Sequence, residues 1–251
     1  MFSSLVIQII VVFLVIIVAL ILFKPEKRPH YAFLFLGVYL VARIVNMFPL
    51  FLDFHIGLKF NWIGHLLIIA WVLIFIRLGP LKPKDIGLTL EHRTGTIIPA
   101  VKATLGIIIF KGILAALVNG GPATGGPPFD SVAAETLIFQ ITMPPLAQEL
   151  LFSGLLLSLI IIALGGRKTD QEFEWNQLIV LAIIVTAFSH AIRFGLVYNT
   201  SLQFRIMSSL IPFIGKTMYS WLRLYTGSLV FPVLAFSTSN FVVWLVPYLL
   251  G

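Results

Sequence analysis

The chain has 251 residues, of which 59% are hydrophobic and only 11% are charged. Soluble globular domains carry about 25% charged residues, so this composition excludes a soluble globular protein and indicates a membrane protein. The net charge is +7, but the basic residues lie in short stretches between apolar runs, which argues against a nucleic-acid-binding surface. The absence of cysteine excludes disulfides, thiolate catalysis and cysteine-ligated zinc.

The apolar runs are long enough to cross a bilayer several times. A helical span needs about 20 mostly apolar residues, so about eight spans with short loops account for the whole length. The sequence therefore predicts an all-α fold, a polytopic membrane helix bundle that forms one integral membrane domain. We expect three N-terminal spans in residues 1–76, a cytoplasmic connection at 77–96 and a core of five spans in 97–251.

The first expected span covers residues 2–23, and a charged stretch with two prolines follows it. The fifth expected span is unusual, because the apolar segment from about residue 130 to residue 164 is too long for one straight crossing. Pro144 and Pro145 lie within it, and proline interrupts helical hydrogen bonding. We therefore expect a short helix at the membrane interface before the fifth span. The other expected spans are 31–52, 62–76, 97–118, 177–197, 203–224 and 227–250.

The orientation is predicted from the Lys and Arg residues between the spans. The odd-numbered connections hold 10 of them and the even-numbered connections hold 3, if Arg193 and Arg223 are counted as loop residues. Loops rich in Lys and Arg stay on the cytoplasmic side. We therefore expect an integral protein of the cell (inner) membrane with both termini on the non-cytoplasmic side.

Charged residues inside the expected spans are the first candidates for function, because a charge at membrane depth is costly unless it is paired or lines a cavity. Lys102 and Lys216 are expected to reach the interface with their long side chains. Arg43 and Lys111 lie deeper. An ion pair with Glu149 and a bound anionic lipid are both open explanations for these two cations.

Three polar residues are predicted to reach a similar depth on three different spans. Glu149 lies about one turn into the fifth span, and His190 and Asn240 each lie 13 residues beyond the inner start of theirs, which is about 20 Å along the helix. These side chains have the positions needed for a single buried site. A cluster of hydrogen bonds that only joins the helices is the alternative explanation.

Several motifs resemble those of a known family. The run PPLAQELLFSGLL at 144–156 is similar to the EExxxR signature of the CAAX-protease and bacteriocin-processing (CPBP, or Abi) intramembrane proteases. The run AFSH at 187–190 resembles the family's FxxxH signature, and LYTGSLVFPVL at 224–234 resembles the approach to its HxxxN signature. KDIGL at 84–88 is similar to an element that precedes the family's core spans. The resemblance covers roughly residues 80 to 245, in the family's order.

The resemblance also implies that the catalytic site is degenerate. Glu149, His190 and Asn240 match family positions, and they are the candidate catalytic residues. Four family positions carry other residues. The carboxylate that activates water in the family corresponds to Gln148, the arginine to Ser153, the phenylalanine of FxxxH to Thr186 and the histidine of HxxxN to Phe236. An amide cannot take a proton from water near neutral pH, so the role of the base is lost at position 148.

Three functional hypotheses remain open: the resemblance implies the first two, and Glu149 beside two prolines inside an expected span keeps the third. The first is a catalytically impaired family member that acts as a binding protein, a scaffold or an accessory subunit of a membrane complex, with a membrane protein, a transmembrane peptide or lipids as partners. The second is an active endopeptidase in which Glu149 and His190 activate water and Asn240 donates to an oxyanion. The third is a transporter of a small molecule or lipid. No cofactor is expected, because Glu149 and His190 are too few ligands for a zinc site.

Overall fold

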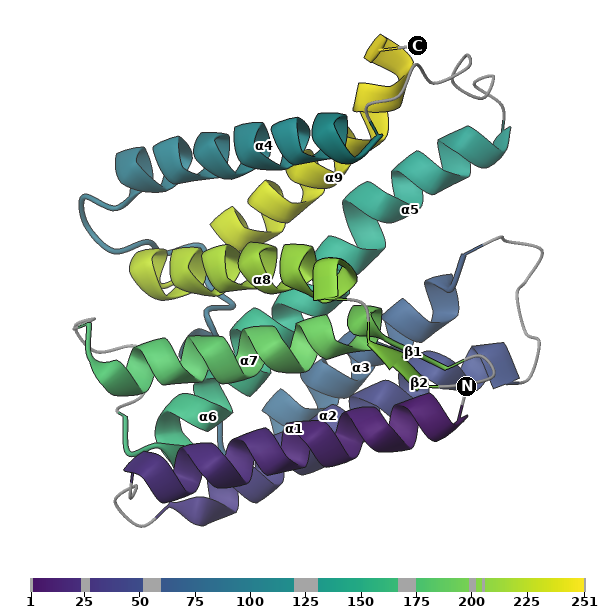
Figure 1. Cartoon of the computed structure of the whole chain (residues 1–251). Helices are drawn as coiled ribbons and strands as arrows, with labels where there is room; N and C mark the ends of the chain where they lie inside the picture. Colours follow the sequence, from purple (N-terminus) through teal and green to yellow (C-terminus); the bar gives the residue numbers. More distant parts are fainter. Residues whose placement is uncertain are drawn as a thin grey trace.

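The computed structural model describes residues 2–23, 28–51, 60–119, 131–166, 175–198, 202–204 and 206–250. These residues form a bundle of long helices (Figure 1). The Gly- and Pro-rich stretch of the sequence at 119–128 lies almost entirely outside this part of the chain. The α-helices are α1 (Phe2–Phe23), α2 (Pro29–Phe51), α3 (Trp62–Leu78), α4 (Ile97–Asn119), α5 (Ser131–Gln148), α6 (Leu157–Ala163), α7 (Gln177–Gly195), α8 (Ile206–Thr226) and α9 (Val230–Leu250).

The prediction of a polytopic helix bundle is confirmed. Among the described residues, four helical segments are long and apolar enough to cross a bilayer, and shorter apolar segments accompany them. The four segments are Pro29–Pro49, Ile97–Leu114, Ala134–Ala163 and Gln177–Gly195, and the shorter ones are Val6–Leu22, Trp62–Leu78 and Val230–Leu245.

The predicted break at Pro144 and Pro145 is wrong. Both prolines lie inside α5, which continues without interruption into a π-helical segment η2 (Glu149–Leu156) and then into α6. The apolar part of this continuous helix, Ala134–Ala163, has 30 residues. In its most apolar stretch of 18 residues, 94% of the residues are buried inside the bundle. It is therefore the central helix of the bundle, inclined to its neighbours in Figure 1, rather than an interfacial helix followed by a span.

Side chains of α9 explain why the helix tolerates two prolines. In an α-helix the residues at 144 and 145 would donate to the carbonyls of Gln140 and Ile141, but proline has no backbone N–H. Asn240 Nδ2 donates instead to the Gln140 carbonyl at 2.9 Å, and Ser237 Oγ donates to the Ile141 carbonyl at 2.7 Å. A neighbouring helix thus satisfies the carbonyls that the prolines leave free, as a membrane interior requires.

The buried apolar residues form two clusters. The larger cluster joins α1, α2 and α3 to η2, α6 and α7, and the smaller cluster lies between α4, α8 and α9. Leu155, Leu156 and Ile160 of the central helix belong to the larger cluster and are fully buried, whereas Tyr219 and Phe231 belong to the smaller one. The buried polar residues discussed below come from α5, η2, α7 and α8, and they are Gln148, Glu149, Ser153, His190 and Lys216.

The connection between α3 and α4 packs against the helices. It contains the short helix η1 (Pro83–Ile86), and Gly87 follows it with a φ of 79°, a conformation that favours glycine. Leu229 N donates to the Gly87 carbonyl at 2.8 Å. Gly154 of η2 permits the close approach of η1, because a Cβ there would lie 3.2 Å from the Ile86 carbonyl oxygen. The domain boundaries at 76 and 96 stay a prediction.

Two arginines counted as loop residues lie in helices instead. Arg193 is in the last turns of α7, and Arg223 is a buried residue of α8 that donates to the Ser158 hydroxyl at 3.0 Å. The segment after α7 forms a small antiparallel hairpin of β1 (Leu196–Tyr198) and β2 (Leu202–Phe204), which short apolar runs do not predict. Arg193 belongs to the total for the even-numbered connections and Arg223 to the total for the odd-numbered ones. Leaving both out lowers each total by one, so the difference on which the predicted orientation rests is unchanged.

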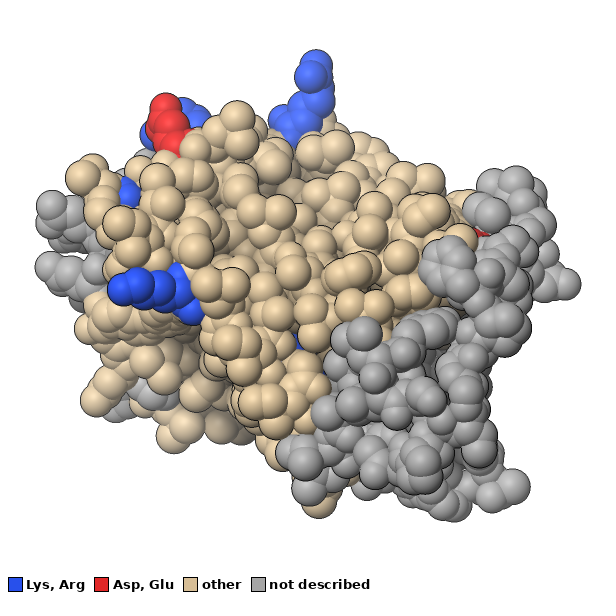
Figure 2. Space-filling view, turned by 90° about the horizontal axis from the view of Figure 1, so that it is seen from above, with Lys and Arg blue, Asp and Glu red and all other residues tan. Residues whose placement is uncertain are grey.

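The outer surface is apolar over wide areas. Figure 2, which views the bundle from the side of α4, shows Lys, Arg, Asp and Glu mainly towards the margins of a largely uncharged face. On α4, Ile98 is 70% exposed and Ile109 is 61% exposed. Apolar side chains exposed along the length of a helix are typical of contact with lipid.

Candidate functional site

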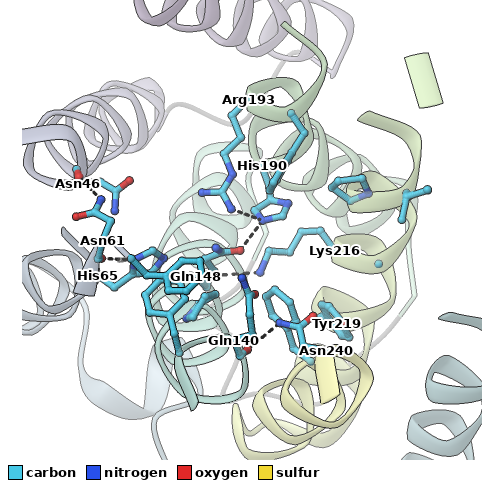
Figure 3. A pocket seen from close by; sticks show the side chains of 18 of the residues that line it. Asn46, Asn61, His65, Gln140, Gln148, His190, Arg193, Lys216, Tyr219 and Asn240 are labelled. Carbon is cyan, nitrogen blue, oxygen red and sulfur yellow. Dashed lines mark hydrogen bonds between the residues drawn. The ribbon is translucent and has the colours of Figure 1, made fainter. Parts of the chain in front are cut away.

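A cavity of about 490 Å³ lies where α4, α5, α7, α8 and α9 approach one another. Figure 3 shows its polar side chains pointing towards a common centre from these helices, with Asn46, Asn61 and His65 on the side of α2 and α3. Its polar residues from the other helices are Lys111, Gln140, Gln148, His190, Arg193, Lys216, Tyr219 and Asn240.

Gln148 and His190 are in direct contact in this cavity. His190 Nε2 lies 2.8 Å from Gln148 Oε1 and 3.2 Å from Arg193 Nη2. The ring stacks edge-on against Phe152, with centroids 5.0 Å apart, and is 4% exposed. The histidine is therefore held between an amide and a guanidinium, and the group beside it is not a carboxylate.

Glu149 does not line the cavity. Successive helical residues are turned by about 100°, and the Glu149 side chain is directed to Lys216 instead of lining the cavity beside Gln148. One carboxylate oxygen, Oε1, lies 2.6 Å from Lys216 Nζ, and the other, Oε2, accepts a hydrogen bond of 2.5 Å from Ser153 Oγ. Glu149 is fully buried and Lys216 is 1% exposed, so this is an ion pair without solvent.

Lys216 joins this ion pair to the cavity. Its ammonium also donates to the Gln148 carbonyl at 3.2 Å and to Ser153 Oγ at 3.3 Å. The prediction that Lys216 reaches the membrane interface is wrong, because the lysine turns inward to a carboxylate 67 residues away in the sequence. Ser153 stands where the family resemblance expects an arginine, and a cation from α8 occupies the neighbouring space.

Phe236, at the position of a family histidine, forms an aromatic pair with Tyr219. Its ring stacks on Tyr219 with centroids 5.0 Å apart and an interplanar angle of 17°. Lys111 Nζ lies 5.1 Å from the Phe236 ring centroid and 5.2 Å from that of Tyr219, and it donates to Ser239 Oγ at 3.3 Å. A phenylalanine here cannot donate to or accept from a substrate.

The structure brings together part of the predicted site. His190, Asn240 and Gln148 line one cavity, whereas Glu149 lies behind its wall. Asn240 uses its amide nitrogen for the Gln140 carbonyl that Pro144 leaves free. Among the described residues, no group of three or more His, Asp or Glu side chains is arranged to hold a metal ion.

Sequence reasoning missed two residues of the site. The charge comparison predicts a loop position for Arg193, and the length of its side chain predicts an interfacial position for Lys216. For Arg193 the available signal was its spacing of three residues from His190, since residues three apart lie on the same face of a helix. For Lys216 the signal was weaker. A cation inside one span and Glu149 inside another are expected to pair, but Arg43 and Lys111 are also cations inside spans.

The chemistry of this arrangement differs from that of a water-activating site. General base catalysis requires a basic group within about 3 Å of the water or hydroxyl that it deprotonates. In the cavity the position next to His190 holds an amide, and the carboxylate of the adjacent Glu149 is paired with Lys216 and hydrogen-bonded to Ser153. The same cavity presents several N–H donors from Lys111, Arg193 and Lys216.

Comparisons with known proteins support the resemblance drawn from the motifs. Residues 131–242 match the family model described as type II CAAX prenyl endopeptidase Rce1-like. No curated protein and no solved structure matches the chain significantly. The matched residues include Gln148, Glu149, His190 and Asn240 but not the KDIGL run at 84–88, whose resemblance stays a prediction. Residues 131–242 are therefore similar to the Rce1-like family of type II CAAX prenyl endopeptidases, and the match covers less than half of the chain.

Proposed function

We propose that this protein is a catalytically impaired member of its family that binds a ligand or a transmembrane partner in the cavity without cutting it. The observation that carries the proposal is the state of Glu149. This carboxylate is fully buried, paired with Lys216 at 2.6 Å and bonded to Ser153 at 2.5 Å. To activate water it would have to leave both partners and turn into the cavity, which separates two buried charges.

The residues that line the cavity support the same proposal. Gln148 occupies the place of the base, and its amide oxygen lies 2.8 Å from His190. Phe236 occupies the place of a histidine and stacks on Tyr219. Catalysis by this family's mechanism needs correct placement of each group, and an error of about 1 Å can reduce the rate by about 100-fold. A cavity with polar donors and apolar walls still suits binding.

A cleavage assay tests the proposal. The full-length parent, Glu149→Ala and His190→Ala are each reconstituted in liposomes with a transmembrane reporter substrate. We expect no cleavage by any of them, and we expect Glu149→Ala to lower the unfolding temperature because Lys216 then lacks its counter-charge. An active endopeptidase is the alternative, and it would appear as cleavage by the parent that both substitutions abolish.

The proposal includes a topology in which both termini lie on the non-cytoplasmic side. The ends of α1 and α9 that carry the termini lie at the same end of the bundle as the β1–β2 hairpin (Figure 1). A reporter fused after Gly251 and a second inserted near Pro122 should therefore give the same, non-cytoplasmic signal. Opposite signals from the two reporters would contradict the expected even number of spans between Pro122 and Gly251. Cytoplasmic signals from both would mean that the orientation is the reverse of the proposed one.

A further inference from the structure

The charged side chains that line the cavity all carry the same sign. They are Lys111 from α4, Arg193 from α7 and Lys216 from α8, and no Asp or Glu lines it among the described residues. Lys216 is neutralised by Glu149 behind the wall. Within the described part of the chain, Lys111 and Arg193 have no carboxylate within ion-pair distance. The cavity therefore carries an excess of positive charge inside an apolar bundle.

Lys111 is placed so that its ammonium faces the cavity. Within the described part of the chain it donates to Ser239 Oγ at 3.3 Å, which uses one of the three N–H donors of an ammonium. The rings of Tyr219 and Phe236 lie beside it, and Gly215 leaves room for it on α8. A Cβ at Gly215 would lie 3.4 Å from Lys111 Cε and 3.8 Å from its Nζ.

Arg193 also has unused donors. Its Nη2 contacts His190 Nε2 at 3.2 Å, and its guanidinium lies over the Phe194 ring at 4.4 Å. The Nε atom is buried and has no hydrogen-bond partner, and the same is true of His190 Nδ1. A buried donor without an acceptor is rare, and it indicates an acceptor that a bound group supplies.

The walls around these cations are apolar. Phe60, Phe139 and Phe194 line the cavity together with Ile211 and Pro212. Phe194 is 41% exposed, so the cavity opens at the surface beside Arg193. A ligand that fits these features has an anionic group for the cations and an apolar part for the walls. Free inorganic phosphate has only the first.

We propose that the cavity binds the phosphate group of an anionic membrane lipid between Lys111 and Arg193. This inference rests on the proposed function, because it names the ligand class of the cavity that the proposed function leaves open. The phosphate oxygens accept from the ammonium and the guanidinium, and charge-assisted bonds of this kind are the strong ones. The acyl chains leave along the apolar wall at Phe194. Two buried like charges without a counter-ion are costly in a membrane, and the bound phosphate offsets that cost.

Lipid binding by the purified full-length protein tests this inference. Parent protein in nanodiscs of phosphatidylcholine with increasing phosphatidylglycerol should retain phosphatidylglycerol through detergent extraction, as measured by native mass spectrometry. Lys111→Gln and Arg193→Gln should each weaken retention by about 10-fold or more, because each removes a charged hydrogen-bond donor. Lys111→Arg should keep it, because the charge and donors remain.

Matched controls remove exposed charges from the same protein. Lys102→Gln lies on the same helix as Lys111, and Arg77→Gln removes an exposed arginine of α3. Both should retain phosphatidylglycerol as the parent does. Equal loss in Lys111→Gln and Lys102→Gln would overturn the inference, because it would mean that general surface charge attracts the lipid.

The remaining arms separate the sources of the phosphate. Inorganic phosphate should neither stabilise the parent against heat nor compete with the lipid, and an equal effect of inorganic phosphate would assign the site to a dissolved anion and overturn the lipid assignment. Retention of phosphatidylcholine equal to that of phosphatidylglycerol would also overturn it. Cleavage of a reporter that depends on Glu149 would contradict the proposed function, but it would leave the lipid measurement readable on its own.

Discussion

Lys216→Met should lower the free energy of unfolding by about 3–5 kcal/mol, the cost of breaking a buried ion pair by removing one partner. The substitution leaves the fully buried Glu149 carboxylate with the hydrogen bond from the Ser153 hydroxyl and without its counter-charge. It also removes the donor to the Gln148 carbonyl. The expected result is a large drop in the unfolding temperature of the purified protein in detergent, measured from intrinsic tryptophan fluorescence.

The double variant Glu149→Gln/Lys216→Met separates the ion pair from simple packing. Removing both charges leaves no uncompensated ion, so this variant should recover most of the lost stability. Lys102→Met is the matched control, since Lys102 is exposed on α4, and it should change the unfolding temperature little. If Lys216→Met is as stable as the parent, this pair does not hold Glu149 in place, and the proposed catalytic impairment loses its main support.

The positions of the helices were predictable, and the shape of the central one was not. The apolar runs gave spans close to α1, α3, α4 and α7, because length and hydropathy alone decide whether a segment can cross a bilayer. The continuity of α5 through Pro144 and Pro145 depends on Ser237 and Asn240. Those residues lie about a hundred positions away, and local sequence rules have no access to such partners.

The candidate site was also only partly predictable from the sequence. The motif at 144–156 and the run ending at His190 placed Gln148 and His190 near each other, and their atoms are 2.8 Å apart. Glu149 was predicted to share that site, but the turn of about 100° between successive helical residues directs it to Lys216. Its partner could not be chosen from the sequence, because Arg43, Lys111 and Lys216 are all cations inside spans. Arg43 instead donates to Gln8 Oε1 at 3.0 Å.

Gln148→Glu combined with Phe236→His should give measurable endopeptidase activity to a protein that we propose to be catalytically impaired. The first substitution places a carboxylate beside His190, at the position of an amide whose oxygen is already 2.8 Å from the ring. The second replaces a ring that lines the cavity with an imidazole. A positioned general base contributes about 10²–10⁴-fold in rate, so cleavage of the transmembrane reporter should rise from background to a clear time course.

Ser153 is left unchanged in this variant for a structural reason. It is fully buried, and Lys216 Nζ lies 3.3 Å from its hydroxyl, so an arginine at position 153 would overlap a side chain that already supplies a cation there. Arg193 lines the same cavity and is not paired with Glu149, so its charge offsets part of the added negative charge. The folded protein should therefore accept Glu at 148 with a small change in unfolding temperature.

Two controls decide whether any gained cleavage comes from the restored base. Adding His190→Ala to the double variant should abolish it, because the carboxylate then lacks the histidine that stands beside it. Gln140→Glu with Phe236→His places a carboxylate in the same cavity but two turns earlier on α5, and it should remain silent because a misplaced base does not reach the water. Equal cleavage by both carboxylate variants would mean that added negative charge, rather than position 148, makes the cavity reactive. A folded double variant without cleavage activity would show that the two substituted positions alone do not account for the proposed impairment. The ion pair between Glu149 and Lys216 would then be the next feature to remove.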